Sequence, residues 1–427
     1  MYNISQLKKL LKENGMNEKF SLIYGGDKKS VLEAYNRLDD TIKHFESIEK
    51  TEEVYLFSAS GRTELSGNHT DHNNGYVLTA SINLDKLAAV SKRDDKKIIV
   101  YTDYSNNPDI IDIDDLNINK NEYGKSSALV RGVCAAIKNK GGNIGGCTVS
   151  LNNKVLIGSG LSSSASFESL IGEIQNALYN DDKISKADIA KIGQYAENIY
   201  FGKPCGLMDQ MGCSIGGIIS IDLENNDSPI IEKVEYDFES NGYALMIVDV
   251  KGDHSGLTNE YAAIREEMNA IAKYFGKKVC REINKQELIE NASKLRTEIG
   301  DRAVMRAYHF LEENERVINQ IKALKNNDIS TYIKLMNESG LSSFMYLQNC
   351  YSITSSKNMG IALGLTLTKD FLKGEGACRV HGGGFAGTIQ ALIPINIVEE
   401  YKKYMDSIFG EGSTVKIRVR QSPVCEI

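Results

Sequence analysis

The stretch that most constrains the fold is residues 158–165, with the sequence GSGLSSSA. It follows an apolar run at residues 147–157 and leads directly into a helical pattern at residues 166–178. Glycines let the backbone approach a ligand closely, and serines add hydroxyl groups where a helix begins with unpaired amide N–H groups. This arrangement is typical of a phosphate cradle. An ordinary glycine turn followed by a serine N-cap would have the same local sequence, so other parts of the chain must decide.

The composition, 41% hydrophobic and 25% charged residues, is typical of a globular protein. The chain has 427 residues, enough for two or three domains of roughly 100 to 200 residues each. A net charge of −7 argues against nucleic acid or an anionic membrane as the main partner. The eight cysteines have no paired spacing, and the N-terminal pattern is an amphipathic helix without a signal-peptide core. We therefore expect free thiols and a cytoplasmic protein with no membrane span.

Helical and strand patterns alternate along most of the chain. Residues 1–50 predict short charged helices, and residues 53–60 and 97–101 predict strands. Long helices are expected at residues 258–274, 304–324 and 329–336. Such alternation indicates layered α and β structure. We expect an N-terminal helical extension at 1–50, a first domain at 51–240 and a second at 241–427.

A second motif, residues 61–75, has the sequence GRTELSGNHTDHNNG. It places six polar side chains within eleven positions: Arg62, Glu64, Asn68, His69, Asp71 and His72. So many different polar groups suit a pocket that recognises hydroxyls through hydrogen bonds. Two alternatives stay open at this point, a metal site at the H-x-x-H pair beside Asp71 and a plain solvated loop.

A third motif, HGGGFAG at residues 381–387, formally matches the G-x-G-x-x-G fingerprint. A dinucleotide fingerprint opens a helix, whereas this segment runs into TIQALIP, which is a strand pattern. We interpret it as a backbone loop that packs tightly against another group, such as a ligand.

Together with AENIYFGKPCGLMDQ at residues 196–210, these motifs in this order resemble the galactokinases of the GHMP kinase superfamily. The resemblance covers roughly residues 53–423. It implies an α+β fold of two domains, with the active site in the cleft between an N-terminal S5-like domain and a C-terminal ferredoxin-like domain. It also implies transfer of the γ-phosphoryl group of ATP to the anomeric hydroxyl of galactose, with Mg²⁺. The implied partners are the sugar and ATP, and the implied state is a monomer or a weak homo-oligomer.

The resemblance assigns roles to individual residues. Asp209 and Arg62 match the catalytic pair, and Ser164 and Glu197 match the magnesium ligands. The residues that match sugar contacts are Asn68, His69, Asp71, Gly206, Tyr261 and Gly383. The residues that match the nucleotide-binding loop are Gly158, Ser159, Gly160, Leu161, Ser162, Ser163 and Ser164.

These roles also make chemical sense. Phosphoryl transfer mainly requires positioning and charge neutralisation, which a glycine loop at a helix N-terminus and Mg²⁺ supply. Asp209 would accept the proton of the sugar hydroxyl, and Arg62 would keep that carboxylate ionised. Glu197 and Ser164 offer the hard oxygens that Mg²⁺ prefers. Taken alone, Asp209 would equally suit a turn, Glu197 a solvated helix face and Arg62 a surface ion pair.

The chain departs from the galactokinase pattern at two positions of the 61–75 motif, and the third motif has His381 before its glycines and Ala386 where galactokinases usually have glycine. Glu64 stands where galactokinases usually have asparagine, and Asn68 stands where they usually have glutamate. The position of Asn68 contacts the sugar around C6 in that family, and a neutral amide there relieves repulsion of a substrate carboxylate. Galactose is the first choice, with galacturonate or another galactose-configured sugar as the alternative. A sensor that binds sugar and ATP with little catalysis is a further alternative, although its phosphate loop and Asp209 would be expected to be damaged.

Overall fold

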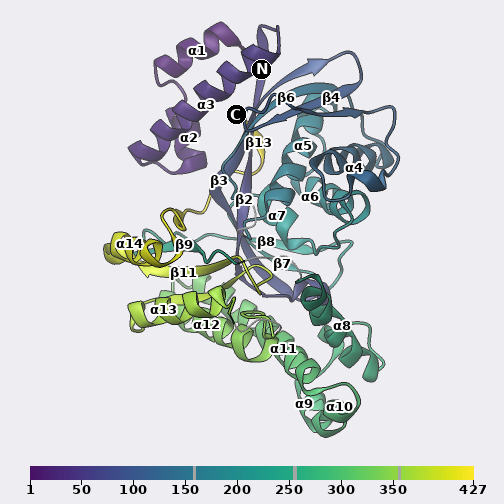
Figure 1. Ribbon diagram of the computed structural model, residues 1–427, viewed down its shortest axis with the longest axis vertical. Helices are drawn as coiled ribbons and strands as arrows, with labels where there is room; N and C mark the ends of the chain where they lie inside the picture. Colours follow the sequence, from purple (N-terminus) through teal and green to yellow (C-terminus); the bar gives the residue numbers. More distant parts are fainter. Residues whose placement is uncertain (157–159, 253–256, 354–356) are drawn as a thin grey trace.

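The computed structural model describes residues 1–156, 160–252, 257–353 and 357–427. Within these residues the strands form a sheet of nine strands and a sheet of four. In Figure 1 the larger sheet runs from the top of the molecule to below its middle, and the smaller sheet lies beside its lower end, with most of the later helices underneath. The expected alternation of helices and strands in layers is confirmed.

Two long antiparallel strands, β2 (Glu53–Ser66) and β3 (Tyr76–Arg93), organise the larger sheet. Its main path also contains β1 (Tyr2–Asn3), β6 (Gly146–Asn153), β4 (Lys97–Thr102) and β5 (Asp109–Asp112). Near its beginning, β3 pairs with β7 (Ile218–Asp222), which in turn pairs with β8 (Ile230–Val234). Because β2 extends to Ser66, the first six residues of the 61–75 motif form a strand, and the plain-loop interpretation is wrong for them.

The middle of β3 is covered on both faces. Leu87 and Ala89 pack against the N-terminal helices, whereas Ala88 and Val90 pack against the helices on the other side of the sheet. Side chains alternate along a strand, so a strand buried on both faces needs an unbroken apolar run. The N-terminal helices are α1 (Ile4–Lys12), α2 (Asn17–Tyr24) and α3 (Lys28–Ile48). The helices on the other face include α4 (Ser126–Asn139) and α5 (Ser163–Tyr179).

Helical segments follow the glycine–serine loop, and two of them, at residues 163–179 and 208–214, differ from the sequence-based prediction. Helix α5 begins at Ser163, three residues earlier than expected. Next come α6 (Lys186–Tyr195) and a π-helical turn, Ala196–Phe201. Residues 208–214, for which the sequence predicts no helix, form α7 (Met208–Ser214), which packs against β2 and β3. Asp209 therefore lies on a helix.

The smaller sheet is antiparallel, with the order β10 (Ala377–His381), β11 (Thr388–Pro394), β9 (Tyr243–Asp249) and β12 (Thr414–Ile417). The three long helices expected here are α8 (Thr258–Tyr274), α11 (Asp301–Lys325) and α12 (Ile329–Ser342). The remaining helices are α9 (Lys285–Glu290), α10 (Ala292–Glu298), α13 (Gly360–Leu372) and α14 (Val398–Phe409). One apolar core joins the two sheets, with Leu65 and Leu78 from the larger and Ile247 and Leu392 from the smaller.

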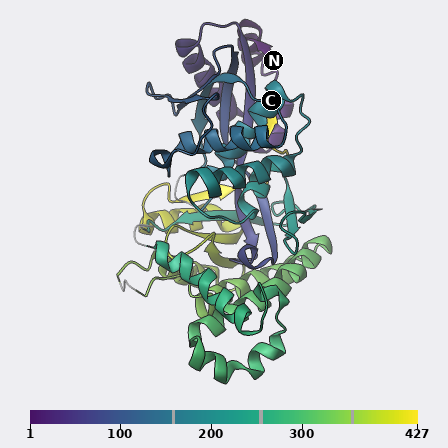
Figure 2. The same cartoon turned by 90° about the vertical axis from the view of Figure 1, so that its right-hand side faces the viewer.

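Residues near both ends of the chain return to the larger sheet. Strands β1 and β13 (Cys425–Glu426) both pair with β2, and the two end labels lie close together in Figures 1 and 2. Residues 425–426 thus share a sheet with residues 53–66, and the domain boundaries at 50 and 240 stay a prediction. In the part of the chain that the structure describes, no helix has the length and apolarity needed to cross a bilayer.

Candidate active site

Arg62 and Asp209 form the centre of the site. Arg62 lies on β2 beside an irregularity in the strand register at residues 60–62, a feature that redirects side chains. Its Nη2 atom is 2.7 Å from Oδ1 of Asp209, and only 4% of Arg62 is exposed. Nη1 of Arg62 also donates a hydrogen bond to the carbonyl of Gly160. Residues from three separate motifs therefore meet at one point, and Arg62 is not a surface ion pair.

The carboxylate of Asp209 is held ionised. Burial alone would raise the pKa of Asp209, but the Arg62 charge and hydrogen bonds from Ser162 and Arg62 outweigh it and lower the pKa below its usual value. Oγ of Ser162 donates to Oδ2 of Asp209 at 2.5 Å. The side chain of Asp209 is 34% exposed, so a ligand can reach it. An ionised, reachable carboxylate has the properties of a proton acceptor.

The described part of the glycine–serine loop leads into α5. Gly158 and Ser159 lie outside the described residues. Leu161 is fully buried, and its carbonyl accepts a hydrogen bond from the backbone N–H of Arg62. Ser162 has a left-handed backbone, with φ 60° and ψ 56°, and its side chain makes no capping hydrogen bond because it points to Asp209. The ordinary serine N-cap is therefore wrong for Ser162, and α5 presents the positive end of its dipole at this loop.

Ser164 and Glu197 lie together beside this centre. Oγ of Ser164 donates to Oε1 of Glu197 at 3.0 Å. Glu197 belongs to the π-helical turn and is 2% exposed, so it is not on a solvated helix face. Nε2 of Gln210 donates to Glu197 at 2.8 Å, and Nζ of Lys203 lies 3.4 Å away. The hydroxyl and carboxylate oxygens fit Mg²⁺, which usually takes its other ligands from water and substrate phosphates.

Metal binding by His69 and His72 has no support in the geometry. Their ring centroids are 6.4 Å apart, and Nε2 of His69 donates to the carbonyl of Gly383 at 2.9 Å. Burial lowers the pKa of His69 to about 4, so its ring is neutral near pH 7. Among the described residues, no cluster of three or more His, Cys, Asp and Glu side chains is arranged to hold a metal ion.

The structure brings the other predicted sugar contacts together at the end of β2. Gly206 lies against Asp71, because a Cβ atom at 206 would fall 1.8 Å from Oδ2 of Asp71. Gly383 lies against Tyr261, since a Cβ atom at 383 would fall 2.8 Å from that ring. The hydroxyl of Tyr261 donates to the carbonyl of Gly384 at 2.9 Å. Segments far apart in sequence thus meet around one small region.

Asn68 occupies this region but is enclosed by protein. It is fully buried, and its Nδ2 donates to Oε1 of Glu64 at 3.0 Å and to the carbonyl of Gly382 at 2.7 Å. Its Oδ1 accepts from Nδ2 of Asn349 at 2.7 Å and from Oγ of Ser343 at 3.3 Å. A direct contact between Asn68 and a sugar stays a prediction.

Sequence reasoning missed the partner of Glu64. Glu64 is 2% exposed and forms an ion pair with Arg379, which is fully buried on β10. Burial raises the pKa of Glu64, and the charges of Arg379 and Arg62 offset this only in part. Nε2 of His381, also on β10, forms a hydrogen bond with Oγ1 of Thr63 at 3.1 Å. No local sequence pattern pairs residues more than 300 positions apart. Lys203 and Gln210, which contact Glu197, lie inside the 196–210 motif and could have been found there.

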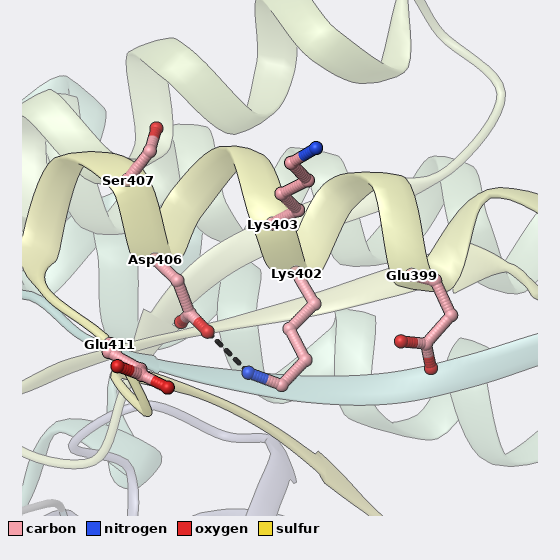
Figure 3. Close-up of a pocket in the computed structure, with 6 residues that line it drawn as sticks. All are labelled: Glu399, Lys402, Lys403, Asp406, Ser407 and Glu411. Carbon is pink, nitrogen blue, oxygen red and sulfur yellow. Dashed lines mark hydrogen bonds and ion pairs between the residues drawn. The ribbon is translucent and has the colours of Figure 1, made fainter.

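A depression on α14 lies apart from this site. It has a volume of about 440 Å³, and its lining residues are Glu399, Lys402, Lys403, Asp406, Ser407 and Glu411. Figure 3 shows Lys402 directed at Asp406 along the outside of the helix, where the two form an ion pair. None of these six residues belongs to the four motifs, so the depression does not change the assignment of the site.

Comparison with known proteins agrees with the geometry. The family described as "GHMP kinases N terminal domain" matches residues 128–217, and the "Galactokinase galactose-binding signature" matches residues 43–92. The solved structure of Lactococcus lactis galactokinase complexed with galactose has a TM-score of 0.76 and covers 97% of this chain and 100% of that chain, at 22% identity. The mevalonate kinase of Methanococcus jannaschii has a TM-score of 0.59 and covers 87% of this chain and 99% of that chain, at 17% identity. These two structures confirm the expected α+β fold.

Curated relatives are more similar in sequence. A galactokinase of Mannheimia succiniciproducens is 32% identical over 378 residues, which is 87% of this chain and 93% of that protein. A galactokinase of Glaesserella parasuis is 34% identical over 356 residues, which is 81% of this chain and 86% of that protein. With these similarities and the motif residues gathered around Asp209, the chain belongs to the galactokinase family of GHMP sugar kinases.

Proposed function

We propose that this protein transfers the γ-phosphoryl group of ATP to the anomeric hydroxyl of galactose, giving galactose 1-phosphate and ADP. The observation that carries the proposal is the meeting of Arg62, Ser162 and Asp209, which come from three different motifs. The contact between Asp71 and Gly206, the latter only three positions before Asp209, supports a sugar site next to it.

Asp209 acts as the proton acceptor in this mechanism. The anomeric hydroxyl gives its proton to the carboxylate of Asp209 as the oxygen attacks the γ-phosphorus, and ADP leaves with the electrons of the broken P–O bond. Arg62 keeps Asp209 ionised and places positive charge beside the transferred group. The N-terminus of α5, with Gly160, Leu161, Ser162 and Ser163, receives the phosphates.

Ser164 and Glu197 are the proposed magnesium ligands. Their oxygens are 3.0 Å apart, and Gln210 and Lys203 both contact the Glu197 carboxylate. When bound, Mg²⁺ neutralises charge on the phosphates. Lys203 adds a further positive charge at the same place, because the neighbouring Glu197 charge overcomes the effect of burial and raises the pKa of Lys203.

The sugar specificity rests on His69, Asp71, Gly206, Tyr261 and Gly383. His69 is neutral and Asp71 offers acceptor oxygens, a combination that suits sugar hydroxyls. The buried ion pair between Glu64 and Arg379 lies behind Asn68. A hydroxymethyl group at C6, as in galactose, needs no cationic partner there, and this supports galactose over galacturonate.

A turnover assay with a panel of sugars tests the proposal. The purified protein is given ATP, Mg²⁺ and galactose, galacturonate, glucose or N-acetylgalactosamine, and ADP release and the phosphorylated sugar are measured. We expect the highest kcat/KM with galactose and a product phosphorylated at C1. Stabilisation by sugar and ATP without ADP release would identify a sensor instead.

We also propose that the enzyme is cytoplasmic and a monomer or a weak homo-oligomer. All eight cysteines are free thiols, as expected in a reducing compartment. Light scattering of the purified protein across a concentration range measures its mass directly, and a stable higher oligomer would contradict the proposal.

A further inference from the structure

Lys86 is a buried cation below the N-terminus of α5. It lies on β3 and shares a face of that strand with Ala88 and Val90, which pack toward α4 and α5. Only 4% of Lys86 is exposed. Its Nζ donates to Oγ of Ser163, the first residue of α5, at 3.1 Å and to Oδ1 of Asn153 at 2.9 Å. The ammonium group is therefore aimed at the loop that receives the phosphates.

This is an unfavourable place for a positive charge in the protein alone. A helix N-terminus carries a partial positive charge and stabilises anions, not cations. Both hydrogen-bond partners of Lys86 are neutral, and among the described residues no carboxylate lies within ion-pair distance of its Nζ. Burial lowers the pKa of Lys86 to about 8, and the charges of Asp103 and Asp85 offset this only in part.

The neighbouring carboxylate, Asp85, forms no ion pair with Lys86, because its own partners lie on the opposite face of β3. Asp85 accepts hydrogen bonds from the hydroxyl of Tyr24 at 2.8 Å and Oγ of Ser58 at 2.5 Å, and its carboxylate lies 2.7 Å from Nη1 of Arg37. Tyr24 and Arg37 belong to the N-terminal helices α2 and α3. These contacts fix β3 at residue 85 and so determine where the next side chain projects.

Lys86 is also close to the catalytic pair. The thiol of Cys213, on α7, lies in the fields of both Arg62 and Lys86, and its Sγ is 3.9 Å from the carbonyl of Ser162. Two buried cations, Arg62 and Lys86, thus lie next to the described end of the phosphate loop. Arg62 is neutralised by Asp209. Lys86 is the cation left without an acidic partner among the described residues.

We propose that Lys86 is an additional phosphate-binding residue, whose charge beneath Ser163 strengthens the binding of the nucleotide polyphosphate at the N-terminus of α5. The inference rests on the proposed kinase function and extends it to a residue outside the four motifs. A polyanion would satisfy both the ammonium group and the helix dipole at once. Lys86 acts on the nucleotide partly by holding Ser163 in position, and it needs its positive charge to do so. It is therefore a positioning residue.

Calorimetric titration of the full chain with ATP, ADP and AMP in the presence of Mg²⁺ tests the inference. Lys86→Met removes the charge but keeps most of the volume, and Lys86→Arg keeps the charge. Lys92→Met is the matched control, because Lys92 is on the same face of β3 but exposed and over the ring of Tyr179. We expect Lys86→Met to weaken ATP and ADP binding about tenfold and AMP binding much less, with Lys86→Arg within about threefold of wild type.

The same variants give a kinetic readout that packing alone would not produce. The KM for ATP should rise in Lys86→Met while the KM for the sugar stays unchanged. ATP binding by Lys86→Met equal to wild type, or equal losses in Lys86→Met and Lys86→Arg, would overturn the inference. If Lys86→Met fails to fold, Lys86→Gln provides the same comparison with a neutral polar group. Failure of the wild-type protein to bind ATP would instead overturn the proposed function itself.

Discussion

Gly206 and Asp71 are in such close contact that no side chain can stand at position 206 without moving the carboxylate. The ideal position of a Cβ atom at 206 is 1.8 Å from Oδ2 and 2.5 Å from Cγ of Asp71. Asp71 is on the turn after β2, and Gly206 precedes α7, so the contact joins the sugar motif to the segment of Asp209. The absence of a side chain at 206 is therefore a requirement for the position of Asp71.

Gly206→Ala tests this requirement. We expect the KM for the sugar to rise about tenfold or more, because Asp71 must rotate away, while the KM for ATP changes little. Gly26→Ala is a suitable control, since a Cβ atom at 26 would meet nothing within 4 Å. An unchanged KM for the sugar in Gly206→Ala would show that Asp71 does not contact it.

Asp209→Asn tests the proton acceptor. Loss of the carboxylate should lower kcat about a thousandfold, because general-base catalysis is removed while the shape of the site is kept. Asparagine is preferable to alanine here, since the structure places Asp209 on a helix and against the buried Arg62. Sugar and ATP affinities measured by titration should stay close to wild type. A kcat within tenfold of wild type would contradict the role of Asp209.

The Glu64 and Asn68 pair calls for a double variant. Asn68→Glu alone would place two carboxylates about one hydrogen bond apart in a buried region, and we expect it to lower the free energy of unfolding by roughly 2 kcal/mol. Glu64→Asn combined with Asn68→Glu keeps a single carboxylate and should recover most of this loss.

The double variant also tests the sugar specificity of this position. A carboxylate at position 68 repels a substrate carboxylate, so the ratio of kcat/KM for galactose to that for galacturonate should rise about tenfold. The control is Asn68→Asp, which tests whether charge alone is sufficient. An unchanged ratio in the double variant would remove position 68 from sugar recognition.

The lowered pKa of buried Glu313 makes the stability of the fold depend on pH. Burial alone would raise the pKa of this α11 residue, but Arg316 and the hydrogen bond from Ser339 contribute to lowering it to about 2, below the usual 4.5. A carboxylate with a lowered pKa stabilises the fold at pH values above its usual pKa. This stabilisation is lost as the pH falls from about 4.5 toward 2. We expect roughly 3 kcal/mol of pH-dependent stability from this group.

Urea unfolding between pH 3 and pH 7 measures this contribution. Glu313→Gln should be less stable at pH 7 and should show a smaller loss of stability on acidification. Glu315→Gln, an exposed neighbour on the same helix, is the control and should follow wild type. Equal pH slopes for Glu313→Gln and wild type would contradict the role of this carboxylate.

Much of the site could be predicted from sequence because its residues belong to motifs. Arg62, Ser162 and Asp209 were placed together by the order of the motifs, and the structure brings them into hydrogen-bond contact. Helix α7 was missed, because glycine and proline precede it and its seven residues are too few for a clear periodic pattern. Its position is set by packing against β2 and β3, which a local pattern does not contain.

The remaining polar contacts depend on pairing across the fold. Arg379 meets Glu64, and Lys86 meets Ser163, only after strands and helices from distant parts of the chain have packed. Helix α13 was also missed, since its two glycines, Gly360 and Gly364, argue against a helix in isolation. Each miss is a case in which tertiary contacts outweigh local preference.

The return of residues 425–426 to β2 affects how the protein is made. Buried Arg420 donates a hydrogen bond to Ser58, a residue 362 positions earlier, and Val424 is fully buried in the core that contains Phe57. During translation, β2 leaves the ribosome long before residues 425–426, which pair with Phe57 and Ser58, have been synthesised. This part of the edge therefore stays open to other strands until residues 425–426 have been added, and a chain released before residue 420 would leave it exposed to aggregation.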